Sequence, residues 1–336
     1  QEYIECAAIA TVADIVPLVS ENRIIAALGI DYLNNNPMNL GIRSLIEVSE
    51  LKKINAGNIG FVIAPKINAA GRLGEADKVV ELYLTEDPAK AGEIASYLSL
   101  ENRKRQDIEM EILELAKAQV EKENLDNQGI MVVAGEGWHP GVIGIVASRL
   151  QEIWYHPTIV IGIDEEGVGK GSCRSVEGFN IFEALQSCAE LFSTYGGHEQ
   201  AAGFSLVSTN IPEMTQKINQ YAKEKALHKL LNKTLYYDGI MPLEEVSEGL
   251  IEELEHFEPF GVGNPGPVFM VEGVAPQSAK RMGGDGSHLM FTLPPYRCVG
   301  FGMGDLMDEG IEGQFSILCK PEINCFNNKK SVQLLL

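Results

Sequence analysis

The pattern of apolar and polar positions changes character along the chain. In the first hundred or so residues, short apolar runs are broken by Gly, Asn and Pro, which predicts mainly helices. A longer helix follows, because apolar residues recur every three or four positions between Ile94 and Gln119, opposite a charged face. Turn-forming residues at 124–129 end it. We interpret this helix as a connection between two domains, because the composition differs on its two sides. A plain packed helix is the alternative.

Beyond this helix the pattern alternates between strands and helices. A helix is predicted over 141–153, and short apolar runs predict strands at 130–135, 158–163, 167–172 and 202–207. This alternation is typical of an α/β domain.

The last part of the chain has a mostly β pattern, interrupted by one helix at 243–257. Its short apolar runs are separated by Gly- and Pro-rich turns and lie at 235–240, 268–274, 288–293, 297–301, 314–318 and 331–336. Such a series fits a small barrel of the OB type. The fold class expected for the whole chain is therefore α/β, followed by a β-barrel.

Composition and charge narrow the classes of function. The 336 residues carry a net charge of −20, which argues against a nucleic-acid partner unless a local groove is positive. No run of apolar residues is long enough to cross a bilayer and no signal peptide is seen, so the sequence predicts a cytoplasmic protein with no membrane contact. The six cysteines form no C-x-x-C pair, so neither a disulfide framework nor a structural zinc site is expected. The chain starts at Gln1 and runs directly into apolar residues, as a cut through a domain would.

One carboxylate, Asp14, lies inside the apolar run 11–18. A buried Asp needs a partner, so Asp14 is expected to cap a helix, pair with a cation or bind a metal. A single carboxylate does not define a metal site, because hard divalent cations take several oxygen ligands.

Two segments combine small residues with cations that suit phosphate. Residues 65–74 hold Asn68 and Arg72, and the guanidinium of an Arg donates paired hydrogen bonds to phosphate oxygens. Residues 169–175 hold two hydroxyls and Arg174 on a glycine-rich strand end, which could surround an anion. The second segment lacks the spacing of an ATP-binding P-loop. The alternative for residues 65–74 is a close-packed turn with an exposed Arg, and for residues 169–175 it is a plain β-turn.

Two further segments pair a histidine with glycines. Gly196, Gly197 and His198 precede a strand of small residues, which favours close approach of a ligand. His139 lies in a flexible segment before a helix, whose N-terminus favours anions. A lone histidine is more often structural, which is the alternative for both.

The last domain offers rings and cations. Residues 257–265 form a rigid aromatic loop, and several strands carry side chains able to stack on bases or bind phosphate: Arg281, His288, Phe291, Tyr296, Arg297 and Phe301. For any single ring, a place in the core is the alternative.

These segments together resemble the RecJ branch of the DHH phosphoesterases. Residues 11–18 are similar to the family's fourth catalytic motif, and residues 65–74 to its P-[RK]-[IL]-N-A-A-G-R segment. Further similarities follow in chain order: H-P-G-V-I-G-I-V-A-S at 139–148, the phosphate segment at 171–175, G-G-H-x-x-A-A-G-F at 196–204 and P-F-G-x-G-N-P-x-P-x-F at 259–269.

The resemblance implies four parts in order. These are the end of a DHH catalytic domain over 1–92, a long connecting helix over 93–127, a DHH-associated α/β domain over 128–230 and an OB-type domain over 231–336.

It also implies a function for the parent protein, a 5′-to-3′ exonuclease on single-stranded DNA in repair and recombination, with Mn²⁺ or Mg²⁺ activating water. Asp14 would be a metal ligand, and Asp14 and His198 would be catalytic. The residues implied to bind substrate are Arg72, Asn68, Ser172, Arg174, Ser175, His139, Gly196 and Gly197. A single-strand-binding protein or a helicase is a further implied partner.

The chain departs from the family pattern in two ways. The family's other metal-binding motifs are missing, since they would lie before residue 1, and Cys173 stands where the family commonly has Gly. The resemblance therefore implies a fragment that binds DNA without cutting it. Two alternatives remain open: a DHH phosphatase of short oligonucleotides or cyclic dinucleotides, and a non-catalytic module that binds DNA or protein.

Overall fold

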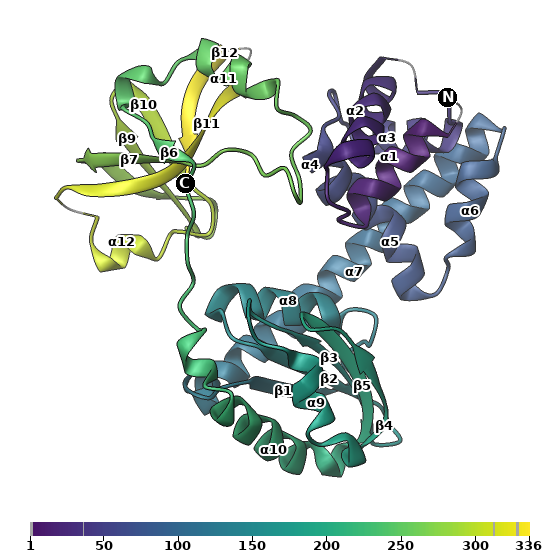
Figure 1. Ribbon diagram of the computed structural model, residues 1–336. Helices are drawn as coiled ribbons and strands as arrows, with labels where there is room; N and C mark the ends of the chain where they lie inside the picture. The colour runs from purple at the N-terminus through teal and green to yellow at the C-terminus, as the bar shows by residue number, and fades with distance from the viewer. Residues whose placement is uncertain (1–2, 36, 312, 327–328) are drawn as a thin grey trace. The chain divides into compact units, whose positions relative to one another are not determined.

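The computed structural model describes residues 3–35, 37–311, 313–326 and 329–336 (Figure 1). The chain divides into two compact units, each built from separate stretches of sequence. The first contains residues 1–38, 51–61 and 235–336, and the second contains residues 39–50 and 62–234. In the described part of the chain, no helix is both long and apolar enough to span a bilayer.

The first unit begins with helices α1 (Ile4–Ala13) and α2 (Ser20–Asn35), with the short α4 (Ala56–Asn58) further along. The first two pack closely because Gly29 has no side chain. A Cβ on Gly29 would lie 2.2 Å from the Cβ of Ala8.

A seven-stranded sheet forms most of the rest of this unit, in the order β6-β7-β11-β12-β10-β9-β8. Its strands are β6 (Gly239–Ile240), β7 (Phe269–Val274), β8 (Gln277–Met282), β9 (His288–Leu293), β10 (Tyr296–Gly300), β11 (Phe315–Phe326) and β12 (Lys329–Leu335), with helices α11 (Glu248–Glu255) and α12 (Leu306–Glu309). Buried side chains from five of these strands form the core, including Val271, Phe291, Cys298, Ile317 and Leu334. The expected β domain is present. In the described residues no ladder joins β6 to β8, so the sheet is not a closed barrel.

The loop of residues 257–265 packs on the segment that follows α1. The Leu18 N–H donates to the carbonyl of Val262 at 2.6 Å, and Arg23 Nη2 donates to the carbonyl of Phe257 at 2.8 Å. Asn264 closes the loop on itself, because its side-chain amide donates to the carbonyls of Phe257 and Pro259 at 2.9 and 3.0 Å. The loop is thus a contact within the first unit, between residues far apart in sequence.

The second unit starts with helices α3 (Leu40–Val48), α5 (Ala64–Leu73), α6 (Asp77–Leu84) and α7 (Pro88–Glu123); a π-helical turn (Ile59–Ile63) precedes α5. Helix α7 is the long helix that the sequence predicts, and it starts a few residues earlier than expected. Asp87 caps its start by accepting the Ala89 N–H at 2.9 Å, and Asn124 ends it with a left-handed backbone (φ 51°).

A five-stranded sheet follows, in the order β1-β2-β3-β5-β4. Its elements are β1 (Met131–Glu136), α8 (Ile143–Trp154), β2 (Thr158–Ile163), β3 (Val168–Arg174), α9 (Ile181–Gln186), β4 (Phe192–Gly197), β5 (Ala201–Val207) and α10 (Ile211–Glu224). Alternate residues of β2 enter different cores: Val160 packs with α7 and α8, whereas Ile159 and Ile161 pack with α9 and α10. The helices therefore cover both faces of the sheet (Figure 1), which explains why β2 is apolar after Thr158.

Candidate phosphate-binding site

The end of strand β3 presents a half-buried guanidinium with no counter-charge. Arg174 Nε donates to Ser148 Oγ on α8 at 3.0 Å, and its Nη1 donates to Ser172 Oγ at 3.2 Å and to the carbonyl of Cys173 at 2.8 Å. No carboxylate of the described residues forms an ion pair with Arg174. Burial is the main cause that lowers the pKa of Arg174, and the charge of Arg72 lowers it further. A cation in this position favours an anionic ligand.

The first turn of α8 leaves room beside this guanidinium. A Cβ on Gly144 would lie 3.0 Å from Ser172 Oγ and 3.3 Å from Arg174 Nη2. The Ile143 and Ile145 N–H groups already donate to the carbonyls of His139 and Val142. The helix start therefore attracts negative charge mainly through its dipole. Because Gly144 has no side chain, a space remains between the Ser172 hydroxyl, the Arg174 guanidinium and the start of α8.

Arg72, in the last turn of α5, supplies a second guanidinium. Its Nη1 donates to the carbonyl of Gly141 at 3.0 Å, and a Cβ on Gly141 would lie 2.5 Å from the carbonyl oxygen of Arg72. His139 holds the same loop, since its Nδ1 accepts the Gly141 N–H at 3.1 Å. Asn68 lies one turn before Arg72 on α5 and is exposed. Helix α5 can therefore contact the loop before α8 only because residue 141 is a glycine.

The register of the sheet brings the glycine–histidine segment toward the same strand end. Arg174 pairs with Ala201, whose carbonyl accepts the His198 N–H at 2.8 Å. Ser172 pairs with Gly203, which in turn pairs with Gly196. His198, Gly196 and Gly197 are exposed.

The two glycines differ in what they require. A Cβ on Gly197 would lie 2.4 Å from Ala202 Cα, and its φ is 150°, so the backbone itself needs glycine there. Gly196 has no neighbour within 4 Å of a Cβ, so its face of the sheet is open.

Two of the expected site residues differ from the others, because one makes a structural contact and the other belongs to the first unit. Ser175 is buried, and its hydroxyl donates to the carbonyl of Phe179 at 2.6 Å, so it holds the chain beyond β3. Asp14 belongs to the first unit. It is exposed at the end of α1, where its backbone N–H donates to the carbonyl of Ala10 at 2.9 Å. Its side chain has no partner among the described residues. The expectation of a buried Asp14 is therefore wrong, because the apolar run around it ends at the surface.

No group of three His, Cys, Asp or Glu side chains that could hold a metal occurs among the described residues. Asp14 alone does not meet the needs of a divalent cation, which takes several oxygen ligands.

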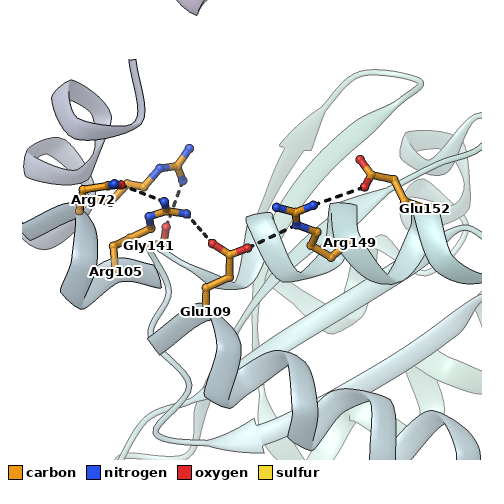
Figure 2. A network of polar contacts seen from close by, with 7 residues as sticks. Arg72, Arg105, Glu109, Gly141, Arg149 and Glu152 are labelled. Carbon is orange, nitrogen blue, oxygen red and sulfur yellow. Dashed lines mark hydrogen bonds and ion pairs between the residues drawn. The ribbon is translucent and has the colours of Figure 1, made fainter. Parts of the chain in front are cut away.

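A cluster of charges behind the site was missed from the sequence. Glu109 on α7 accepts from Arg105 and, at 3.4 Å, from Arg149 Nε on α8, while Arg149 also lies 4.0 Å from Glu152 (Figure 2). Arg105 and Glu109 are only 8% and 7% exposed, although the sequence places them on the charged face of the helix. The i,i+4 spacing of Arg105 and Glu109 predicts an ion pair from the sequence. The burial of this pair follows from contact with α8 and could not be predicted in this way.

The rings and cations expected on the last domain have different fates. Phe291 is 1% exposed and belongs to the core, which was the alternative to a base-stacking role. The Tyr296 hydroxyl donates to the carbonyl of Val246 at 2.6 Å. Arg281 is held by Asp305 and Asp308. Phe301 is 61% exposed, with the His288 ring 5.2 Å away and edge-on.

Comparison with known proteins finds two domain models that match this chain. Residues 127–224 match the model of the DHHA1 domain, and residues 237–336 match that of the RecJ OB domain. The chain is 37% identical to the single-stranded-DNA-specific exonuclease RecJ of Bacillus subtilis over all of this chain and 43% of that protein. It is 36% identical to the RecJ of Thermus thermophilus over 91% of this chain and 43% of that protein. The chain thus spans less than half the length of these two relatives.

Solved structures give the same result. The crystal structure of Thermus thermophilus RecJ with Mn²⁺ aligns with a TM-score of 0.86 at 31% identity, over 99% of this chain and 49% of that one. The structure of the same protein with Mg²⁺ aligns with a TM-score of 0.85 over 51% of that chain.

Proposed function

Because this chain is of the RecJ type and carries a DHHA1 domain followed by a RecJ OB domain, we propose that it holds the DNA-recognition part of a single-stranded-DNA-specific exonuclease. The parent protein would cut from 5′ to 3′ in DNA repair and recombination. The observation that carries the proposal is Arg174, a half-buried guanidinium that faces a hydroxyl, a helix start and Arg72, and that pairs with no carboxylate among the described residues.

The ligand that suits this site is the phosphate at the 5′ end of the strand. A terminal phosphate carries up to two negative charges and three free oxygens, whereas an internal phosphodiester carries one charge. Two guanidinium groups can donate paired hydrogen bonds to the terminal group. Arg174 Nη2, Arg72 and the Ser172 hydroxyl would hold its oxygens, and His198 would contact the nucleotide that follows. Asn68 and His139 would support the site from α5 and from the loop before α8.

Divalent metal would serve the chemistry of the parent protein, where Mn²⁺ or Mg²⁺ activates water against the phosphodiester. Asp14 would be one of its ligands. Since Asp14 is alone among the described residues, we propose that this chain binds single strands without cutting them.

The exposed Phe301 favours an additional strand contact on the last domain. Bases stack on exposed rings whatever their sequence. A single-strand-binding protein or a helicase is a further proposed partner. A phosphatase of short oligonucleotides is the competing function, and it would make no use of this ring.

The test is binding of short single strands with a 5′-phosphate or a 5′-hydroxyl, measured by fluorescence anisotropy. Arg174→Ala should weaken binding of the phosphorylated strand by about 1.5–3 kcal/mol, the usual range for a hydrogen bond to a charged group. It should affect the hydroxyl strand much less.

Lys223→Ala is the matched control. Like Arg174→Ala, it removes one cation from the second unit, but this cation is exposed and lies on α10, on the other face of the sheet. It should change neither affinity. Equal losses for both strand ends in Arg174→Ala would show that Arg174 does not recognise the 5′ end.

A further inference from the structure

One buried carboxylate lies behind the phosphate-binding site and holds two guanidinium groups. Glu109 on α7 accepts a hydrogen bond from Arg105 on its own helix, one turn earlier, and from Arg149 on α8 (Figure 2). Arg105 is held from a second side, where its Nη2 donates to Asn102 Oδ1 at 2.9 Å. Burying a carboxylate and a guanidinium is costly unless each is paired, and here both are.

The two arginines are linked to different parts of the site. Arg149 directly follows Ser148 on α8, and the Ser148 hydroxyl accepts the Nε–H of Arg174. Arg105 lies close enough to Arg72 for their charges to interact. Burial is the main cause that lowers the pKa of Arg105, and the charges of Arg72 and Arg149 lower it further, while Glu109 opposes this.

We propose that Glu109 is a positioning residue of the phosphate-binding site. By anchoring Arg105 near Arg72, and by tying α7 through Arg149 to the helix that carries Ser148, it fixes the positions of Arg105, Arg72 and Arg174 relative to one another. The site can then favour the doubly charged terminal phosphate over a phosphodiester. This inference rests on the proposed binding of a 5′-phosphate at Arg174 and Arg72.

Two effects compete when Glu109 loses its charge, and they have opposite signs. A more positive site would attract every strand more strongly, whatever its 5′ end. Loss of the anchor would instead leave Arg105 buried beside Arg72 and Arg149 with no counter-charge. An unpaired buried charge is strongly unfavourable, so the arginines should move apart. The extra attraction is weakened by salt, whereas the buried contacts are little screened. The second effect should therefore prevail.

The experiment compares Glu109→Gln and Glu109→Asp with the unchanged chain on strands of about eight nucleotides, within the size range of single-strand sites. Each strand carries a 5′-phosphate or a 5′-hydroxyl, and anisotropy is read at low and moderate salt. Glu109→Gln should reduce the preference for the phosphorylated strand about tenfold, or about 1.4 kcal/mol. Glu109→Asp keeps the charge and should restore part of the preference, which a loss of packing alone would not explain.

Glu152→Gln is the matched control, because its carboxylate is 64% exposed and lies 4.0 Å from Arg149 Nη1, whereas Glu109 is buried. It should leave the preference unchanged. Urea unfolding checks that each variant folds. If Glu109→Gln does not, Arg149→Met serves instead, since Arg149 is 58% exposed, and it should reduce the preference in part.

The outcomes separate the two proposals. An unchanged preference in Glu109→Gln, or in Arg149→Met where that variant is used, would overturn the positioning role, provided that Arg174→Ala still abolishes the preference. A gain for both strands in Glu109→Gln would also overturn it, because simple charge would then dominate. If the unchanged chain shows no preference for a 5′-phosphate, the proposed function itself fails, and the role of Glu109 fails with it.

Discussion

Replacing Gly263 by Ala should destabilise the first unit by disturbing the contact between the loop of residues 257–265 and the segment after α1. Gly263 has a φ of 77°, and a Cβ there would lie 3.2 Å from Pro17 Cβ and 3.3 Å from Val19 Cγ1. A left-handed backbone costs a residue other than glycine about 1–2 kcal/mol. Crowding in a well-packed contact adds about 1–3 kcal/mol. The expected total is about 2–5 kcal/mol.

Gly302→Ala separates the two causes. Gly302 has a similar φ of 71° in the same unit, but no atom lies within 4 Å of its Cβ position. This control should therefore show the backbone cost alone, about 1–2 kcal/mol.

The assay is urea unfolding, together with hydrogen exchange of the Leu18 amide, which donates to the carbonyl of Val262. Gly263→Ala should lower protection of this amide, whereas Gly302→Ala should not. Equal losses of stability in both variants, with the Leu18 amide still protected, would refute the assigned contact.

Two further predictions concern chemistry and strand length. This chain should release no nucleotides from single strands with Mn²⁺ or Mg²⁺, because Asp14 has no companion ligands among the described residues; metal-dependent release that Asp14→Ala abolishes would contradict this. Phe301→Ala should weaken binding of long strands by about 1–3 kcal/mol and spare short 5′-phosphorylated ones, because one exposed ring can stack on one base. Anisotropy on two strand lengths measures this, with the exposed Tyr236→Ala as control, and an unchanged long-strand affinity would exclude stacking on Phe301.

Strands buried on both faces could be predicted from the sequence, and exposed ones could not. Strand β2 was predicted at its exact bounds because its side chains enter two cores, leaving an uninterrupted apolar run. Strand β4 was missed because it lies at the edge of the sheet with most of its residues exposed, so no alternation marks it. Strand β8, also at an edge, was missed for the same reason.

The candidate site was only partly visible in the sequence. Arg72, Ser172 and Arg174 stood out because glycines and hydroxyls surround them, and the structure brings their segments together around α8. Glu109 did not stand out, because a charged residue on a helix usually faces solvent. Its burial depends on Arg149, 40 residues later in the chain, which periodicity within one helix does not reveal.

The central claim, that the second unit binds the 5′-terminal phosphate at Arg174, can be tested most directly by ³¹P NMR. A short 5′-phosphorylated strand gives one resonance for its terminal phosphate, separate from those of its phosphodiesters. Addition of the chain should shift or broaden the terminal resonance first, and Arg174→Ala should abolish this response. A response confined to the phosphodiesters, or a terminal response that persists in Arg174→Ala, would contradict the account.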